Sequence, residues 1–366
     1  MTPRGIIDGA IGIICGRIVA IRRSLDSGRG PSLGIPPHGL PRGASRAPRG
    51  AKTLNVHGAY VAPGFIDAHV WGDSQQLSRE LVKQGTTAFL CAIGPGPRAT
   101  VLHELARTAE ARGLEGAQCL GAHLEGPFLN PAKGGALPKR WMRRPTAKEL
   151  QGIDHSGVVR LMTIAPELPG ALEAIRWCRR RGVVASLGHS VASVEQADRA
   201  VDAGAGAVTH VFNGMPLFHH RRPSLLDVAL TDSRLTAMVI LDGVHVSPET
   251  FRLLVKAKGI DQIALVTDSI QRQGWDVVKR RGAYYTKSGT LAGSCLTMMD
   301  AVRNAVRFGG VSISDAVRMG SEVPARLLGD RTRGMLAVGK KADLMAFDKS
   351  FRVLLTMVGG RIIYQR

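Results

Sequence analysis

The 366-residue sequence has few cysteines, few aromatic residues and no long apolar run. Its five cysteines lie far apart and form no CxxC pair, which excludes a disulfide framework and a cysteine-type zinc site. No segment approaches the roughly 20 apolar residues of a membrane helix, and the N-terminal stretch, interrupted by Asp8 and several glycines, lacks a clear signal-peptide pattern. A reducing compartment fits this cysteine usage, so we expect a cytoplasmic protein without a membrane partner.

Acidic residues are also scarce relative to basic ones, since 49 Lys and Arg stand against 29 Asp and Glu, a formal net charge of +20. Such a balance favours acidic partners, or serves only to keep the surface soluble. Residues 22–52 are rich in Arg, Gly, Pro and Ser and hold almost no large apolar side chain. We therefore expect a flexible basic insertion there, and the lack of aromatic residues beside its charges disfavours nucleic-acid binding.

Short apolar runs bounded by turn residues recur regularly from residue 63 onward. Continuous apolar runs are typical of parallel strands that are buried on both faces. The predicted strands are residues 64–70, 86–94, 118–126, 158–167, 183–190, 207–213, 235–243 and 262–269. Helix-like stretches lie between them, and several end in glycine. Eight strand–helix units predict an α/β fold of the TIM type, a (β/α)8 barrel.

Both ends of the chain have the pattern of short strands separated by turns. Neither end is long enough to form a stable domain alone. The economical arrangement is one small β-sandwich domain that is built from both termini, with the barrel inserted between them. We predict that residues 1–61 and 335–366 form the small domain and that residues 62–334 form the barrel.

Metal-type ligands gather at the C-terminal ends of the predicted strands, where barrel enzymes carry their catalytic groups. The residues of this set are His69, His123, Glu125, His189, His210, Asp242, His245 and Asp268. A single histidine at a strand end is more often a structural residue. Asp, Glu and His are, however, disfavoured in apolar runs unless they are paired or ligated, so their recurrence predicts a metal site.

A zinc hydrolase needs three protein ligands and one open position for water, and Glu125, His189 and His210 supply such a set. Zinc lowers the pKa of its bound water toward ~7. A nearby carboxylate then takes the water proton and returns it to the leaving amine. Asp268, directly behind the last apolar run, is the candidate for this role, with helix capping as the alternative.

The motifs around these residues resemble, in order and over nearly the whole chain, those of the N-acetylglucosamine-6-phosphate deacetylase family of the amidohydrolase superfamily. The matching stretches are APGFIDAHVWG, HLEGPFLNP, GHS, THVFNGMP, LDGVHVSPE, LVTDS, GTLAGSCLTMMDAVRN and GMLAVGKKADLMAFD. A lone GHS is a weak signal, but the ordered series is specific. The resemblance implies a homodimeric, metal-dependent enzyme that hydrolyses N-acetylglucosamine 6-phosphate to glucosamine 6-phosphate and acetate.

The resemblance also implies a role for each matching position. Glu125, His189 and His210 would hold one divalent metal, usually zinc. Asp268 would act as general base and then acid, and His245 would contact the sugar near the reacting amide. The implied substrate-binding residues are Asn213, Gly214 and Arg221 at the phosphate and Leu291, Ala292, Gly293 and Cys295 at the sugar. Arginine suits phosphate because its planar fork pairs with two oxygens at once.

Two positions differ from what related metal hydrolases often have. Leu137, in GALP, stands where the family often has a substrate-binding histidine, and a lost polar contact weakens discrimination among substrates. Trp71, in IDAHVWGD, stands where a His-x-His pair has its second histidine. We therefore expect that a second metal site is absent and that His69 and His123 neighbour the metal without binding it. Deacylation of another N-acyl compound is the alternative function, and an inactive barrel that binds an acidic partner is a less favoured one.

Overall fold

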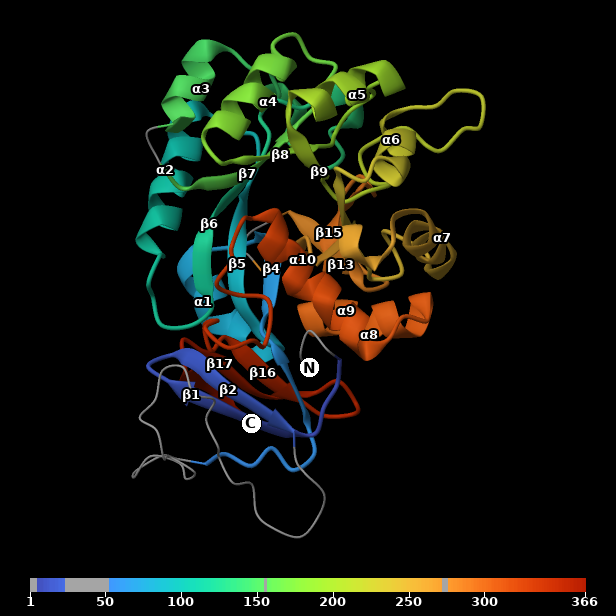
Figure 1. Ribbon diagram of the computed structural model, residues 1–366. Helices are drawn as coiled ribbons and strands as arrows, with labels where there is room; N and C mark the ends of the chain where they lie inside the picture. The colour runs from blue at the N-terminus through green and yellow to red at the C-terminus, as the bar shows by residue number, and fades with distance from the viewer. Residues whose placement is uncertain (1–4, 24–52, 155–156, 272–275) are drawn as a thin grey trace.

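The computed structural model describes residues 5–23, 53–154, 157–271 and 276–366. Figure 1 shows a large strand-and-helix body above a smaller layer of strands, to which β1 and β2 near one end of the chain and β16 and β17 near the other contribute. The basic segment predicted at residues 22–52 falls outside the described residues, except for Arg22 and Arg23, which end strand β2 (Arg17–Arg23).

The eight predicted strands are all present, and they pair in parallel in chain order. They are β4 (Phe65–Trp71), β5 (Thr86–Ile93), β6 (Gln118–Glu125), β7 (Val159–Ile164), β8 (Val184–Leu187), β9 (Ala205–Val208), β10 (Thr236–Ile240) and β11 (Ile263–Val266). Their residues are almost all buried, as expected for strands that are covered on both faces. Strand β4 ends one residue later than predicted, and the other seven end earlier, because the residues that follow them turn away at the site.

The barrel closes through a strand that is interrupted at Thr267 and Asp268. On one side of the interruption, β11 pairs with β10. On the other side, β12 (Ser269–Ile270) pairs in parallel with β4, the first strand of the barrel. The backbone N–H of Asp268 donates to the carbonyl of His69 at 2.9 Å. The single strand predicted at 262–269 is therefore two strands, and Asp268 lies at the junction.

Helices follow the strands and cover the outside of the barrel (Figure 1). They are α1 (Ser74–Leu81), α2 (Arg98–Glu110), α3 (Ala147–Asp154), α4 (Ala171–Arg180), α5 (Val194–Ala203), α6 (Leu225–Thr231), α7 (Pro248–Lys258), α8 (Met298–Gly309), α9 (Ile313–Gly320) and α10 (Glu322–Leu327). Short 3-10 turns occur at Val82–Gln84, Pro131–Lys133, Lys139–Trp141 and Ile260–Gln262. Ser193 and Ser224 begin α5 and α6 with reciprocal side-chain caps, which satisfy backbone N–H groups that lack a helical partner.

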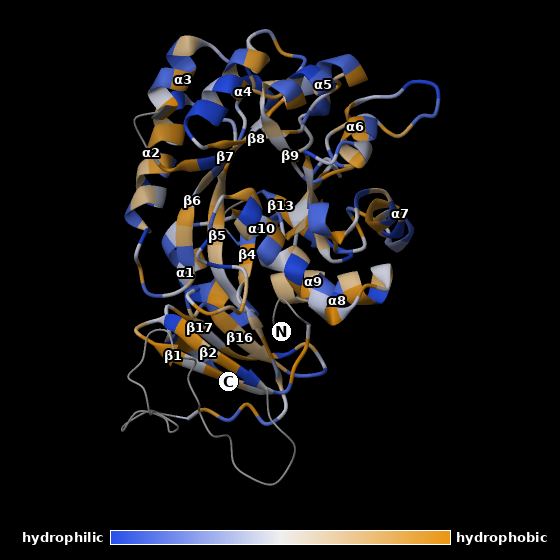
Figure 2. Cartoon of the chain, viewed as in Figure 1, coloured by the Kyte–Doolittle hydropathy of each residue, from blue (hydrophilic) through white to orange (hydrophobic). Residues whose placement is uncertain are grey.

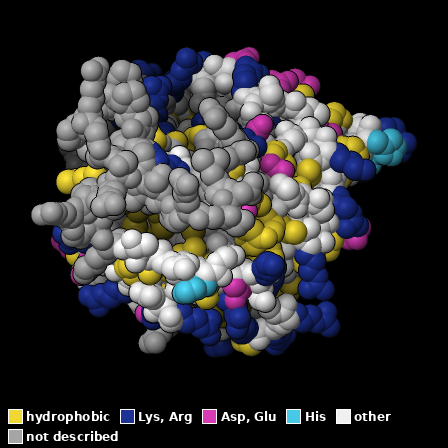
Figure 3. Space-filling view, turned by 60° about the horizontal axis from the view of Figure 1, so that its bottom comes forward, with side chains coloured by type: hydrophobic (Ala, Val, Ile, Leu, Met, Phe, Trp, Pro, Cys, Tyr) yellow, Lys and Arg dark blue, Asp and Glu magenta, His cyan; other side chains and the backbone are white. Residues whose placement is uncertain are grey.

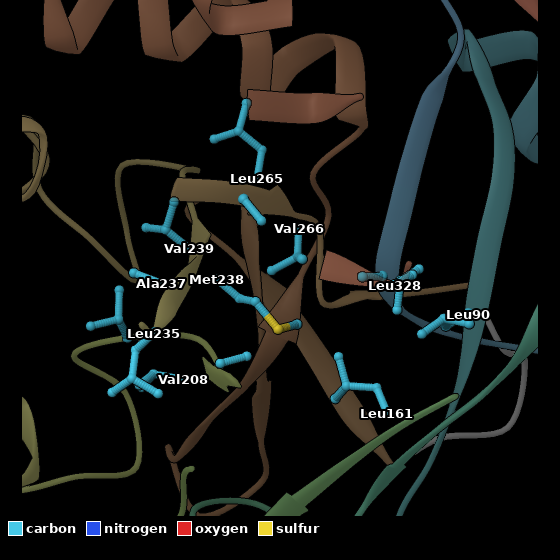
Figure 4. Packing of buried hydrophobic residues seen from close by; sticks show 14 of the residues in the cluster. Leu90, Leu161, Val208, Leu235, Ala237, Met238, Val239, Leu265, Val266 and Leu328 are labelled. Carbon is cyan, nitrogen blue, oxygen red and sulfur yellow. The ribbon is translucent and has the colours of Figure 1, made fainter. Parts of the chain in front are cut away.

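Most buried apolar side chains of the strands and helices form one large core cluster. Met238, Leu161 and Leu265 are fully buried, and Figure 4 shows them within a cluster to which β5, β7, β10 and β11 contribute. Colouring by hydropathy shows the same division, with apolar strands inside and mixed helices outside (Figure 2). Because this core is assembled from all strands, it holds their C-terminal ends in one place.

The two ends of the chain meet in a pair of small sheets. One sheet is antiparallel and has the strand order β18 (Arg361–Gln365), β17 (Val353–Val358), β16 (Leu344–Phe347) and β3 (Tyr60–Pro63). The other is the hairpin of β1 (Gly9–Ile14) with β2. Ile18, Leu344 and Leu355 share an apolar cluster between them. Strand β3 runs past the predicted border at residue 61, and the domain division itself stays a prediction.

A three-stranded antiparallel meander that the sequence did not predict extends the barrel sheet. It consists of β13 (Val277–Arg280), β14 (Ala283–Thr286) and β15 (Leu291–Ser294), and β15 pairs with β12 beside Asp268. The segment 276–289 is basic and polar, and its apolar residues do not alternate over a long enough stretch to signal a strand.

On the visible part of the face in Figure 3, the basic charge is spread out rather than gathered in one patch. On the part of the face in Figure 3 that grey atoms leave visible, Lys and Arg side chains lie all around the rim, with Asp and Glu between them. None of the helices in the described part of the chain is both long enough and apolar enough to cross a lipid bilayer.

Candidate active site at the strand ends

Three predicted ligands meet at the C-terminal ends of β6, β8 and β9. Glu125 is the last residue of β6, and its Oε1 lies 2.8 Å from His189 Nε2 and 2.7 Å from His210 Nε2. All three side chains are buried. The structure thus brings together Glu125, His189 and His210 from positions that are up to 85 residues apart.

Left-handed backbone conformations turn these side chains toward one another. The φ angles are +48° at His189, +29° at His210 and +48° at Asp268. Such values are uncommon for residues other than glycine, and they concentrate at functional sites, where the surrounding structure holds them. Gly214 also has a positive φ, and a Cβ there would lie 3.0 Å from His189 Nδ1. Its hydrogen atom leaves the room that the imidazole occupies.

His189 has the surroundings of a metal ligand. Its Nδ1 lies 2.7 Å from the carbonyl oxygen of Lys133, which can only accept, so Nδ1 carries a proton. Its Nε2 faces the Glu125 carboxylate, so both ring nitrogens point at acceptors. Burial alone would lower the pKa of His189, but the hydrogen bond and charge of Glu125 raise it. A divalent ion in place of the Nε2 proton satisfies the same arrangement, with Lys133 fixing the tautomer.

His69 belongs to the same buried cluster. Its Nε2 lies 3.6 Å from Glu125 Oε2 and 3.1 Å from Asp268 Oδ1. Neither contact has hydrogen-bond geometry, so this buried nitrogen lacks a hydrogen-bond partner in the described part of the chain. Burial alone would lower the pKa of His69, but the charges of Glu125 and Asp268 raise it to about 10. The site therefore favours positive charge between these two carboxylates.

His123 lies behind His69, away from the carboxylates. The two Nδ1 atoms are 2.6 Å apart, and His123 Nε2 is 2.8 Å from Thr163 Oγ1. Burial and the nearby charge of His69 hold the pKa of His123 well below its usual range. His123 therefore supports His69, and its ring nitrogens are occupied by other partners than a metal.

These donors fit a divalent metal. Each of His69, Glu125 and His210 offers one ligand atom, and these atoms lie within 4.8 Å of one another. A carboxylate and neutral imidazoles are the usual ligands of zinc in hydrolases. The uncompensated Nε2 of His69 points into the same space. These residues therefore suit the divalent metal that the sequence predicts. His69 was predicted only to neighbour the metal, but its ligand atom lies within the same group as those of Glu125 and His210.

Asp268 lies beside this cluster and is held by Trp71. The Trp71 Nε1–H group donates to Asp268 Oδ1 at 2.8 Å, and Asp268 is 9% exposed. Beneath it, Thr267 donates its Oγ1–H and its N–H to the fully buried Asp67. Burial raises the pKa of Asp67 to about 6 in spite of these hydrogen bonds. The sequence analysis treated Trp71 only as the replacement of a metal-binding histidine and did not predict its contact with Asp268. The available signal was its position two residues after His69, because residues i and i+2 of a strand share one face.

His245 and Asp242 form a hydrogen-bonded pair at the end of β10. Asp242 Oδ2 lies 2.7 Å from His245 Nδ1, and its Oδ1 accepts the N–H groups of Val244 and His245 at 2.8 Å each. Burial would raise the pKa of Asp242, but the hydrogen bonds from His245 lower it. The carboxylate keeps the proton on Nδ1 and leaves His245 Nε2 for a substrate. Asp242 has no assigned role in the sequence analysis, which noted it only as a strand-end carboxylate.

The predicted phosphate residues fall into two groups. Asn213 and Gly214 follow His210 directly, and the Asn213 side chain donates to the His210 carbonyl at 3.3 Å. Arg221 lies on an exposed loop before α6, which Figure 1 shows projecting from the body. Its guanidinium contacts the neighbouring His220 at 2.9 Å. Within this single described chain, the structure does not bring Arg221 to the cluster.

The predicted sugar-pocket segment, residues 291–295, runs along Asp268. It comprises β15 and Cys295, and the Ser294 N–H donates to the Asp268 carbonyl at 2.9 Å. Gly293 has a φ of +146°, and a Cβ there would lie 2.9 Å from the same carbonyl. Leu291 and Ala292 are half-buried, as is Cys295. The segment therefore forms one wall beside the candidate base.

Comparison with known proteins shows the family of this chain. The model of the amidohydrolase family matches residues 60–363. The N-acetylgalactosamine-6-phosphate deacetylase of Escherichia coli O157:H7 is 35% identical over 82% of this chain and 87% of that protein. The N-acetylglucosamine-6-phosphate deacetylase of Vibrio furnissii is 35% identical over 83% of each chain. The human N-acetylglucosamine-6-phosphate deacetylase is 34% identical over 84% of each.

Solved structures lead to the same group. The N-acetylglucosamine-6-phosphate deacetylase of Pasteurella multocida superposes with a TM-score of 0.88 at 28% identity, covering 100% of this chain and 97% of that one. A variant of the Mycobacterium smegmatis deacetylase, solved in complex with N-acetyl-D-glucosamine-6-phosphate, gives a TM-score of 0.83 at 32% identity and covers 97% and 94% of the two chains. This chain therefore belongs to the amidohydrolase family, in the group of the N-acetylglucosamine-6-phosphate deacetylases.

Proposed function

We propose that this chain hydrolyses the N-acetyl group of N-acetylglucosamine 6-phosphate to give glucosamine 6-phosphate and acetate. The observation that carries the proposal is the meeting of Glu125, His189 and His210 at the C-terminal ends of the barrel strands, where His69 lies between Glu125 and Asp268. Deacetylation of such a substrate is what the printed names of the most similar relatives describe.

We propose Glu125, His189 and His210 as the ligands of one divalent metal, zinc. When bound, such an ion polarises the amide carbonyl and lowers the pKa of a water molecule. The Lys133 carbonyl on Nδ1 of His189 favours His189 over His69, because it fixes the tautomer whose Nε2 can bind a metal. His69, whose Nδ1 adjoins His123, is the competing ligand.

The hydrogen bonds of Asp268 and His245 support two of the remaining proposed roles, and the resemblance to the deacetylases supports the others. Asp268 accepts the proton of the attacking water and returns it to the leaving nitrogen of the substrate. His245, held by Asp242, presents Nε2 to the sugar near the reacting amide. Asn213 and the backbone of Gly214 meet the phosphate. Leu291, Ala292, Gly293 and Cys295 line the sugar pocket.

We also propose that the enzyme is a homodimer in the cytoplasm. Leu217 and Phe218 on the loop before Arg221 are 83% and 62% exposed, which is unusual for two neighbouring large apolar residues. A second copy that covers them would bring Arg221 to the phosphate of its partner. All five cysteines are free thiols, as expected in a reducing compartment.

An acetate-release assay together with metal analysis tests this proposal. We expect acetate from N-acetylglucosamine 6-phosphate and about one zinc per chain, with poor turnover of the unphosphorylated sugar. No acetate from zinc-supplemented protein would refute the proposal.

The assay should also test N-acetylgalactosamine 6-phosphate as a substrate. Leu137 replaces a family histidine, and the E. coli relative is named for this second sugar phosphate. Faster turnover of N-acetylgalactosamine 6-phosphate, or of a substrate with a longer N-acyl group, would favour deacylation of another N-acyl amino sugar.

A further inference from the structure

Trp71 connects the candidate general base to the apolar wall of the site. It is the last residue of β4 and lies two positions after His69, so both side chains share one face of the strand. Its Nε1–H group donates to Asp268 Oδ1 at 2.8 Å, across 197 positions of the chain. The indole is 6% exposed, so water competes little for this hydrogen bond.

The indole at this position can do only part of what a histidine could do there. An indole nitrogen carries a hydrogen at every physiological pH and offers no lone pair, so it donates hydrogen bonds and does not bind metals. A histidine at residue 71 would form a His-x-His pair with His69 and could serve as a ligand. The chain therefore has a fixed hydrogen-bond donor at this place, aimed at a carboxylate.

Packing holds the indole in this orientation. Trp71 shares a small apolar cluster with Ala92 and Ile270, and Leu137 packs against that cluster. A Cβ at Gly94 would lie 3.0 Å from Trp71 Cη2 and 3.5 Å from Leu137 Cδ2, so the missing side chain leaves room for both. Leu137, which stands where the family often has a histidine, thus packs against the cluster that contains Trp71, and the apolar leucine suits the ring.

The hydrogen bond leaves one oxygen of Asp268 for chemistry. Trp71 binds Oδ1 at 2.8 Å and His69 Nε2 approaches Oδ1 at 3.1 Å. In the described part of the chain, neither contact involves Oδ2. A carboxylate that is held by one oxygen keeps the other in a constant direction, and proton transfer depends on such alignment.

We propose that Trp71 is a positioning residue for Asp268. Its indole N–H holds Oδ1 so that Oδ2 faces the proton to be transferred. The proposal rests on the proposed function, in which Asp268 is the general base. Trp71 stands in place of a metal-binding histidine, and in this role it takes part in the same reaction by orienting the base.

An experiment must distinguish the positioning of Asp268 from a direct contact of Trp71 with the substrate. The ring also lines a hollow of about 360 Å³ together with Gly94, Leu137 and Pro138. If Trp71 acted there by touching the substrate, its replacement would change KM. If it acts through Asp268, its replacement lowers kcat and leaves KM unchanged.

The decisive comparison is Trp71→Phe against Trp177→Phe in zinc-loaded full-length protein. Phenylalanine keeps an aromatic ring but lacks the N–H group, and Trp177 is a buried tryptophan on α4, outside the site. For Trp71→Phe we expect kcat per bound zinc to fall about tenfold with KM within about twofold, since a positioned base contributes ~10²- to 10⁴-fold. Trp177→Phe should keep the wild-type kcat.

Three results would overturn the proposal: an unchanged kcat, a change in KM alone, or a loss of activity that equals the loss of zinc. If Trp71→Phe does not fold, benzothienylalanine at residue 71, which has sulfur in place of the N–H group, gives the same comparison with an intact ring shape.

A nuclear magnetic resonance measurement separates this proposal from the proposed function. The indole ¹H–¹⁵N signal of Trp71 should move in Asp268→Ala, whether or not the wild-type protein releases acetate. A wild-type protein without turnover refutes the deacetylase assignment. An indole signal that does not move refutes the hydrogen bond, and with it the role of Trp71.

Discussion

At the scale of single residues, the site is decided by which imidazole nitrogen faces which carboxylate oxygen. His189 and His210 both approach Oε1 of Glu125, whereas His69 lies on the side of Oε2 and Asp268. One metal bound by Glu125, His189 and His210 leaves His69 free to stay between the two carboxylates. This arrangement leads to two predictions about individual side chains.

The first concerns the ligands. His69→Gln should retain about one zinc per chain, and His189→Gln should lose it, because removing one of three protein ligands strongly weakens a zinc site. Inductively coupled plasma mass spectrometry on dialysed proteins measures both. Circular dichroism checks that the variants fold. If His69→Gln loses zinc and His189→Gln keeps it, His69 is the metal ligand and His189 is not.

The second concerns Asp268. Asp268→Asn preserves the shape of the side chain and removes its basicity, so kcat should fall about 10²- to 10⁴-fold while zinc content stays near one. Steady-state acetate release measures the loss. Asp276→Asn, an exposed aspartate near the start of β13, is the control and should keep the wild-type rate. Near-wild-type activity of Asp268→Asn would refute the role of Asp268 as general base.

At the scale of elements, the junction of β11 and β12 is both the closure of the barrel and the seat of the candidate base. The junction is held from one side by β4 and from the other by β15, whose Ser294 N–H binds the Asp268 carbonyl. The close approach of β15 depends on Gly293. Its positive φ and the 2.9 Å distance of a built Cβ from the Asp268 carbonyl leave little room for a side chain.

We therefore predict that Gly293→Ala destabilises the protein by about 1–3 kcal/mol and lowers kcat, because the backbone of Asp268 must shift. Gly289→Ala is the matched control in the same hairpin: its φ is also positive, at +87°, but a Cβ there meets no atom within 4 Å. Thermal unfolding and acetate release distinguish the two. Equal effects of both substitutions would mean that backbone strain alone acts, without displacement of Asp268.

At the scale of the whole molecule, one predicted substrate contact is incomplete. Arg221 lies on a projecting loop with two exposed apolar neighbours, and in the described part of the chain its guanidinium contacts His220. A phosphate near Asn213 and Gly214 would need a cation. A second copy of the chain can supply one, and the exposed apolar residues give it a surface to bind.

We predict that Phe218→Ser shifts the protein toward monomers and raises KM for the phosphorylated sugar, with a smaller effect on kcat. Light scattering after size-exclusion chromatography gives the mass, and initial rates give KM. Leu253→Ser removes a comparably exposed apolar side chain from α7, at 55% exposure, and should change neither. A monomeric wild-type protein with full activity would contradict both the dimer and the role of Arg221 across it.

The sequence by itself determined the order and type of the barrel strands and singled out the candidate site residues. Apolar runs announce buried strands through their own composition, and Glu125, His189, His210 and Asp268 stand out because charged or polar side chains rarely end such runs. The resemblance to the deacetylases, confirmed by comparison, rested on the same local motifs.

Only the tertiary structure decided which of these residues meet. The contact of Trp71 with Asp268 joins positions 197 residues apart, and it exists because the barrel closes between β4 and β12. The place of His69 between two carboxylates, the interruption of the last strand and the loop position of Arg221 have the same origin. Local patterns reflect the neighbours of a residue along the chain, whereas these contacts depend on barrel closure and on the turns that follow each strand.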